Sequence, residues 1–144
     1  MGAGTMGSGI AQVLVRSGYS VVLHDTAQEL AGRGAEKISQ GLAREVEKGR
    51  LTAEEKQQAG SRLKTTTKLP DLASADVVIE AVTEKFEIKA EVFRSLDALC
   101  RPEALFASNT SSISITRLAS VTRRPARFVG LHFFNPVPVM RRVE

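Results

Sequence analysis

The chain has 144 residues, about the size of one domain, with 42% hydrophobic and 25% charged residues, which is typical of a soluble globular protein. No apolar run approaches the roughly 18 residues of a membrane span and no signal peptide is visible, so we expect a cytoplasmic protein with no membrane partner. The net charge of +4 suits an anionic ligand, but the basic residues are scattered and Trp is absent, which argues against nucleic acid. The single cysteine, Cys100, excludes an internal disulfide, and we expect no metal site.

Short apolar runs alternate with longer helical patterns along the chain. We expect helices at 8–17, 26–48, 52–63, 84–99 and 114–119, and strands at 21–23, 75–82, 104–107 and 127–132. Thr52 and Glu55 have the spacing of a capping box and mark the start of the third helix. The alternation predicts one domain, 1–144, of the α/β class, with a doubly wound, mostly parallel sheet.

A glycine motif of the form G-x-G-x-x-G opens directly into the first helix. It comprises Gly2, Ala3, Gly4, Thr5, Met6 and Gly7. Such a loop binds the pyrophosphate of a dinucleotide, because glycine permits a tight turn and a close approach of the backbone, while amides of the helix N-terminus face the phosphate. The motif alone is a weak signal, because glycine-rich turns are common.

An acidic residue in the expected place strengthens this prediction. Asp25 ends the next strand, 21 residues after Gly4, where a carboxylate accepts the ribose hydroxyls of a dinucleotide. Because a carboxylate there repels a 2′-phosphate, the sequence predicts NAD as the cofactor in preference to NADP. A helix N-cap is the alternative role for Asp25. We interpret the neighbouring His24 as a strand-end surface residue.

The dinucleotide motif also requires a strand before it, whereas this chain begins at Met1. We therefore expect a Rossmann-like sheet that lacks its first strand at the N-terminus and has unpaired interior edges. A chain of this extent is expected to be unstable or prone to aggregation. A cooperative thermal melt would contradict that expectation.

The segment from His132 to Met140, with the sequence HFFNPVPVM, places a histidine at the carboxyl end of a strand, on the rim where open α/β sheets bind ligands. Pro136 and Pro138 stiffen the chain that follows, and a reversal with a returning strand would bring Glu144 beside His132. A carboxylate on one imidazole nitrogen raises the basicity of the other, which would give a base for an alcohol proton. From spacing alone, a structural histidine is the alternative.

Four segments, taken in order, resemble the L-3-hydroxyacyl-CoA dehydrogenase family. They are GAGTMGSGIAQ, IEAVTE, SNTSSISIT and HFFNPVPVM, and together they extend along the whole chain. The resemblance implies an enzyme of fatty-acid metabolism that oxidises an L-3-hydroxyacyl-CoA to the 3-ketoacyl-CoA, with NAD as hydride acceptor, as in β-oxidation.

The resemblance also implies individual roles. It makes His132 the catalytic base and Glu144 the residue that orients it, and it places Ser111 on the 3-oxygen of the substrate. Further NAD contacts are implied for Glu84, Lys89, Ser111 and Asn135, and a contact with the CoA part of the substrate for Lys48. Loop-capping and surface roles remain the alternatives for Ser111, Glu84, Lys89 and Lys48.

The sequence departs from the family pattern in its missing first strand and in Arg142, which stands where the family usually has an apolar residue. We expect the strand that carries Glu144 to be less buried for this reason. The helical substrate and dimerisation domain of the family is also absent, so we expect the fragment alone to be inactive and the parent enzyme to be a homodimer through that domain. The alternatives are an inactive dinucleotide-binding fragment and a related sugar-acid dehydrogenase.

Overall fold

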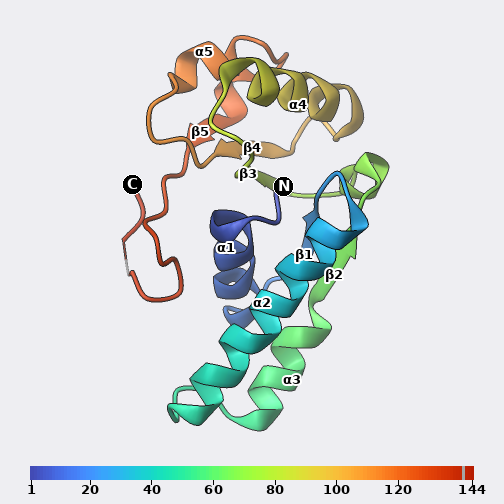
Figure 1. Ribbon diagram of the computed structural model, residues 1–144. Helices are drawn as coiled ribbons and strands as arrows, with labels where there is room; N and C mark the ends of the chain where they lie inside the picture. The colour runs from blue at the N-terminus through green and yellow to red at the C-terminus, as the bar shows by residue number, and fades with distance from the viewer. Residues whose placement is uncertain (141) are drawn as a thin grey trace.

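In the computed structural model, which describes residues 1–140 and 142–144, the chain forms an α/β domain (Figure 1). Its elements in chain order are α1 (Thr5–Arg16), β1 (Val21–His24), α2 (Gln28–Glu47), α3 (Ala53–Ser61), β2 (Leu63–Thr66), η1 (Leu69–Leu72), β3 (Val77–Glu80), α4 (Phe86–Leu99), β4 (Leu105–Ser108), α5 (Ile115–Ala119), η2 (Pro125–Arg127) and β5 (Phe128–Gly130). All strand pairings between these elements are parallel: β1 pairs with β2, and β4 pairs with both β3 and β5. The predicted α/β class and parallel pairing are confirmed.

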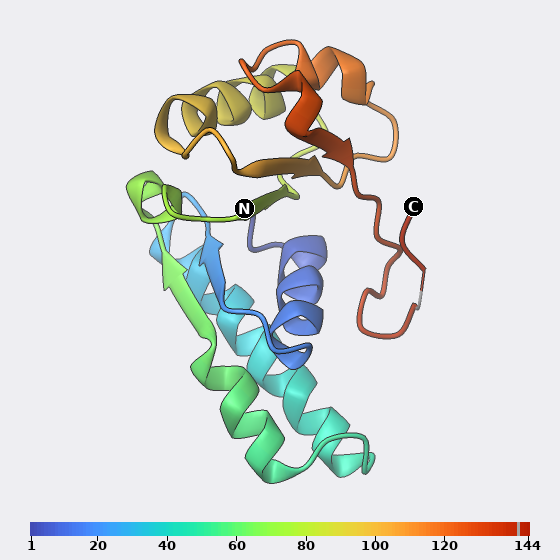
Figure 2. The same ribbon diagram turned by 180° about the vertical axis from the view of Figure 1, so that it is seen from behind.

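The first two residues lie between the two groups of strands and hydrogen-bond to both. The nitrogen of Met1 donates to the carbonyl of Ile79 at 2.8 Å, and the amide of Ala81 donates to the Met1 carbonyl at 2.8 Å. On the other side, the amide of Gly2 donates to the carbonyl of His24 at 2.8 Å. The order across the molecule is therefore β2, β1, residues 1–2, β3, β4 and β5, and Figure 2 shows the N-terminus between the two groups.

Each group of strands has its own hydrophobic core. Helices α1, α2 and α3 pack around β1 and β2, with Val15, Ile38 and Leu42 buried among them (Figure 1). Helices α4 and α5 pack on β3, β4 and β5 around three aromatic rings. The ring of Phe93 has its centroid 5.7 Å from that of Phe106 and 4.5 Å from that of Phe128. This burial accounts for the helical spacing of apolar residues in α2 and α4.

Two of the expectations for this region are wrong. The helix predicted at 52–63 ends at Ser61, and Leu63–Thr66 forms the strand β2. This strand has β1 as its neighbour on one side and exposes Lys64 and Thr65, so it lacks the apolar pattern of the other strands. His24 is only 4% exposed and is therefore not a surface residue. The Thr52–Glu55 capping box is confirmed, with the Glu55 amide 3.1 Å from the Thr52 hydroxyl.

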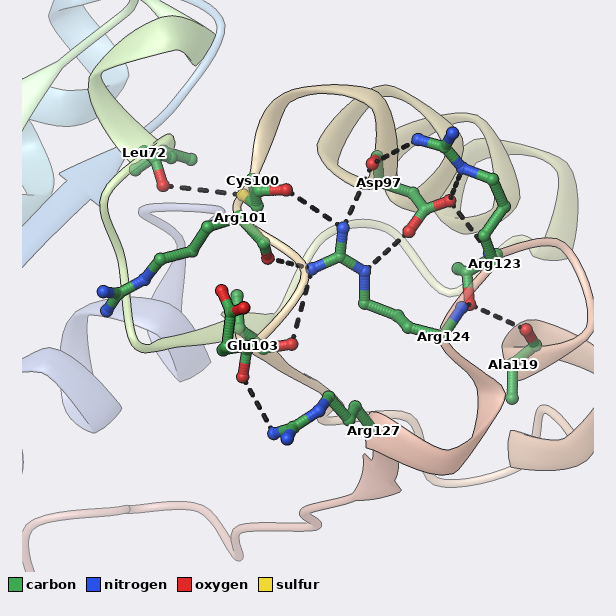
Figure 3. A network of polar contacts seen from close by, with 11 residues as sticks. Leu72, Asp97, Cys100, Arg101, Glu103, Ala119, Arg123, Arg124 and Arg127 are labelled. Atoms are coloured by element: carbon green, nitrogen blue, oxygen red, sulfur yellow. Dashed lines mark hydrogen bonds and ion pairs between the residues drawn. The ribbon is translucent and has the colours of Figure 1, made fainter.

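Arg124 fixes the end of α4 to the segment that leads into β5 (Figure 3). Its guanidinium lies 2.6 Å from the Asp97 carboxylate and also donates to the carbonyls of Asp97 and Cys100, at 3.1 Å and 3.0 Å. The last carbonyls of a helix have no partner within the helix, and the guanidinium satisfies that of Cys100 and shares that of Asp97 with Arg123, which donates to it at 3.1 Å. Partial burial alone would raise the pKa of Asp97, but hydrogen bonds from Arg123 and Arg124 lower it.

We predict that Arg124→Met lowers the free energy of unfolding by about 2 kcal/mol or more, because the buried Asp97 carboxylate loses its closest partner and keeps only the bonds from Arg123. The matched control is Arg127→Met, since Arg127 is exposed and its side chain donates only to the carbonyl of Glu103 among the described residues. This control should change the stability by less than about 1 kcal/mol. Urea unfolding of both variants measures the difference, and equal losses would contradict the role of Arg124.

Candidate active site

The glycine loop makes a tight turn from residues 1–2 into α1. Gly2 has a φ of +87°, and a Cβ added there would lie 2.6 Å from the carbonyl oxygen of Ala81. A Cβ on Gly7 would lie 1.7 Å from the carbonyl oxygen of Gly2. Both positions therefore require glycine, the first for its conformation and both for close packing. Gly4 differs, because a Cβ there would meet no protein atom within 4 Å.

The N-terminus of α1 presents unpaired amides at this open position. Gly4 is the N-cap and has no side chain to occupy them, and the first turn contains no acidic residue. The amides of Thr5, Met6 and Gly7 have no acceptor within the described part of the chain. A helix N-terminus of this kind attracts an anionic group, because its amides and its dipole both favour negative charge. The space in front of Gly4 therefore fits a pyrophosphate.

Asp25 lies beside this loop and holds it. One carboxylate oxygen accepts from the amide of Ala3 at 2.7 Å and the other from the amide of Thr26 at 2.7 Å. The Thr26 hydroxyl also donates to the second oxygen, at 3.4 Å, whereas the oxygen bound to Ala3 keeps a further lone pair and can still accept a ribose hydroxyl. The N-cap of α2 is Ala27, so Asp25 is not the helix cap that the sequence offered as an alternative. The loop, the open helix end and this carboxylate together fit a dinucleotide.

On the other side of the loop, three predicted residues form one cluster at the ends of β3 and β4. Glu84 follows β3, and one of its carboxylate oxygens accepts from the amide of Ser111, which follows β4, at 3.2 Å. Lys89, on α4, lies 3.2 Å from the other oxygen of Glu84. The side chain of Ser111 is exposed, whereas that of Lys89 is buried.

The predicted reversal brings the segments containing His132 and Glu144 together. The His132 amide donates to the Glu144 carbonyl at 2.7 Å and the Glu144 amide to the His132 carbonyl at 2.9 Å, next to an antiparallel bridge between Phe133 and Val143. Residues paired in this way project their side chains to the same side, with Cβ atoms about 5 Å apart. The Glu144 carboxylate itself pairs with Arg142, whose guanidinium is largely exposed. The predicted pairing of imidazole and carboxylate stays a prediction.

Two further predicted residues, Asn135 and Lys48, lie outside the cluster of Glu84, Lys89 and Ser111. Asn135 lines a groove of about 300 Å³ together with Gln12 of α1 and Lys37 of α2. Lys48 is the exposed C-cap of α2, which forms with α3 an arm that projects away from the strands (Figure 1). The structure thus brings Asn135 to the side of α1 and sets Lys48 apart.

Sequence reasoning missed Asn109 and Glu80. The side-chain oxygen of Asn109 accepts from the amide of Phe133 at 2.8 Å, and the amide of Asn109 donates to the carbonyl of Glu80 at 2.8 Å. Asn109 therefore ties the segment after β5, which contains His132, to the ends of β3 and β4. Its position in the polar loop after the strand predicted at 104–107 was the available signal.

Other kinds of site have no support in the described ranges. In 1–140 and 142–144, no group of three or more His, Cys, Asp or Glu side chains is placed to hold a metal ion. Over the same residues, no helix combines the length and the apolar character that crossing a membrane requires. The architecture and the loop define a dinucleotide-binding domain with a parallel sheet.

Comparison with known proteins identifies the kind of dinucleotide-binding domain. Residues 1–144 match the family "3-hydroxyacyl-CoA dehydrogenase, NAD binding domain". The 3-hydroxybutyryl-CoA dehydrogenase of Bradyrhizobium diazoefficiens is 51% identical over 144 residues, which are 100% of this chain and 49% of that protein. The crystal structure of the (S)-3-hydroxybutyryl-CoA dehydrogenase from Ralstonia eutropha is 45% identical and superposes with a TM-score of 0.96, over 99% of this chain and 50% of that one.

The chain therefore belongs to the family of 3-hydroxyacyl-CoA dehydrogenase NAD-binding domains, and its cofactor is NAD. The fold is Rossmann-like, as the sequence predicted. The chain spans about half the length of the curated relatives cited above. We expected a first strand to be missing between β1 and β3. In the structure, residues 1–2 lie at that place and hydrogen-bond to both neighbours.

We predict that Gly4→Ala weakens NADH binding by about 10-fold or more, because the new methyl group enters the space next to the unpaired amides. Stability should change by no more than about 1 kcal/mol, since no protein atom lies within 4 Å of the added Cβ. The matched control is Gly60→Ala on α3, where an added Cβ also meets nothing within 4 Å. Fluorescence titration with NADH measures both, and unchanged affinity in Gly4→Ala would contradict the assigned position of the pyrophosphate.

Proposed function

We propose that this chain takes part in the NAD-dependent oxidation of an L-3-hydroxyacyl-CoA to the 3-ketoacyl-CoA. The observation that carries the proposal is the backbone pairing of His132 with Glu144 at the strand ends, on the same edge as the open glycine loop. The names of the relatives support the substrate class, because they include 3-hydroxybutyryl-CoA and 3-hydroxyadipyl-CoA dehydrogenases. These substrates share the 3-hydroxyacyl-CoA group and differ in the rest of the acyl chain.

In this proposal, the residues of the chain handle the proton and the substrate oxygen. NAD⁺ held at the glycine loop would supply the acceptor for the hydride from C3 of the substrate. His132 is the general base that removes the hydroxyl proton, and the Glu144 carboxylate stabilises the resulting imidazolium. Ser111 donates a hydrogen bond to the 3-oxygen. For this to happen, Glu144 exchanges its pairing with Arg142 for one with the imidazole.

The proposal assigns the remaining residues to cofactor and substrate. The loop from Gly2 to Gly7 and Asp25 hold the adenosine and pyrophosphate end of NAD. The set at the nicotinamide end is Ser111, Asn135, Glu84 and Lys89. Lys48 contributes an exposed cation for the CoA part of the substrate. The proposed setting is β-oxidation of fatty acids in the cytoplasm, with a homodimer as the assembled enzyme.

A dinucleotide-binding chain without catalytic activity is the second candidate. The observation that favours it is the pairing of the Glu144 carboxylate with Arg142, because that pairing leaves the imidazole of His132 without its orienting group. Steady-state assays with acetoacetyl-CoA and NADH separate the two candidates, since only the dehydrogenase oxidises NADH in the presence of that substrate.

We predict that His132→Ala in the full-length protein lowers kcat by about 10²- to 10⁴-fold, because general-base assistance supplies a rate factor of that size. The affinity for NADH should change by less than about 3-fold, since the imidazole is not assigned to the cofactor. Steady-state kinetics with acetoacetyl-CoA and a parallel NADH titration measure both quantities. A variant with near-normal turnover would show that His132 is not the base.

A further inference from the structure

The peptide unit that follows His132 is held from both of its sides. Its carbonyl, which belongs to His132, accepts from the amide of Glu144 at 2.9 Å. Its N–H group, which belongs to Phe133, donates to the side-chain oxygen of Asn109 at 2.8 Å. Because a peptide unit is planar and rigid, these two bonds fix the direction in which the chain leaves the Cα of His132.

The side chain of Asn109 takes the place of a backbone carbonyl. β4 and β5 form a parallel ladder, which the Leu131 amide extends by donating to the Ser108 carbonyl at 3.0 Å. Acceptors along one strand of such a ladder lie two residues apart, because successive carbonyls point to opposite edges of the strand. A continued ladder would therefore offer the carbonyl of Thr110 to the Phe133 amide, but Asn109 provides the acceptor instead.

This substitution frees the chain after β4 to leave the sheet. The Thr110 hydroxyl and the Ser111 amide both bond to one carboxylate oxygen of Glu84, the amide at 3.2 Å. Glu84 follows β3, which lies on the opposite side of β4 from β5, so the loop turns away from the segment with His132. Because Asn109 supplies the missing acceptor, that segment keeps its place while the loop with Ser111 departs.

The backbone of Asn109 is itself fixed from the side of β3. Its amide donates to the carbonyl of Glu80, the last residue of β3, at 2.8 Å. Glu80 has no exposed surface, and its carboxylate accepts from the Ser108 hydroxyl at 2.6 Å, which joins the ends of β3 and β4. The side chain of Asn109 therefore reaches from two joined strand ends to the peptide after His132.

We propose that Asn109 is a positioning residue, whose side-chain carbonyl holds His132 in register with the loop that contains Ser111. The inference rests on the proposed function, in which His132 is the base and Ser111 bonds to the substrate oxygen. Both groups must reach the same hydroxyl, and Asn109 joins the segments that carry them. Misplacing a reacting group lowers the rate strongly, whereas cofactor affinity depends on the separate glycine loop.

The test removes the acceptor in the full-length protein. With Asn109→Ala, amide hydrogen exchange at Phe133 should become about 10-fold faster, because that amide loses its partner. The kcat for acetoacetyl-CoA should fall by about 10- to 100-fold, since the peptide after His132 is then held from one side only. The KM for acetoacetyl-CoA and the Kd for NADH should each change by less than about 3-fold.

A conservative variant restores the acceptor, and a distant variant is the matched control. Asn109→Asp keeps the shape and an oxygen, so exchange at Phe133 should be slow again and kcat should return to within about 3-fold of the unmodified protein. Each protein is assayed at its own pH optimum, because an added charge beside the site moves that optimum. The control is Thr122→Val, which removes a buried hydroxyl that donates to the Ala119 carbonyl at 2.9 Å, and it should leave kcat unchanged.

The unmodified protein keeps the test decisive if the alanine variant fails to fold. The Phe133 amide, bound to a side chain, should exchange within about 10-fold of the rate of the Leu131 amide, which is bound to β4. Exchange of the Phe133 amide at the rate of a free amide would overturn the inference without any variant.

Three results with the variants would also overturn it. Failure of Asn109→Asp to restore slow exchange and kcat would show that the oxygen acceptor does not hold His132. A rise in the Kd for NADH as large as the fall in kcat would assign Asn109 to cofactor binding, and an equal loss of kcat in Thr122→Val would make the effect a general loss of stability. If the unmodified protein lacks activity with acetoacetyl-CoA, the proposed function fails, and exchange at Phe133 still decides whether Asn109 holds this segment.

Discussion

The arrangement of the site depends on the close contact between the backbone of Gly2 and the ends of β1 and β3. The Gly2 amide donates to His24 on one side, and its Cα lies so close to Ala81 on the other that no Cβ would fit. This contact holds the start of α1 between the two groups of strands. The unpaired amides at the start of α1 consequently lie close to Asp25, which accepts from the amide of Ala3.

The two ends of the site are held by different interactions. At the glycine loop, the site is formed by the backbone. The open space before Gly4 and the unpaired amides of α1 can receive an anionic group without any side chain. At the other end, side chains join segments that are far apart in the sequence. Asn109 accepts from the backbone of Phe133, and the carboxylates of Glu80 and Glu84 accept from Ser108 and Ser111. A rigid support of this kind suits a site where the placement of reacting groups determines the rate.

The features that the sequence predicted correctly are those that local spacing determines. The glycine loop, Asp25 and the reversal before Glu144 each depend on residues close together in the chain, and the family resemblance agreed with them. The strand β2 was missed because an edge strand needs few apolar residues. The burial of Lys89 was missed because a lysine on an amphipathic helix usually faces solvent. Its two carboxylate partners become apparent only when β3 and α4 are packed together.

The central claim is that the glycine loop and Asp25 form an NAD site, and titration of the protein with NADH and with NADPH tests it most directly. Because the Asp25 carboxylate lies where the adenine ribose is expected, its charge should repel the 2′-phosphate of NADPH. We predict saturable binding of NADH and an affinity for NADPH that is lower by about 10-fold or more. Equal or tighter binding of NADPH, or no saturable binding of either dinucleotide, would contradict the account.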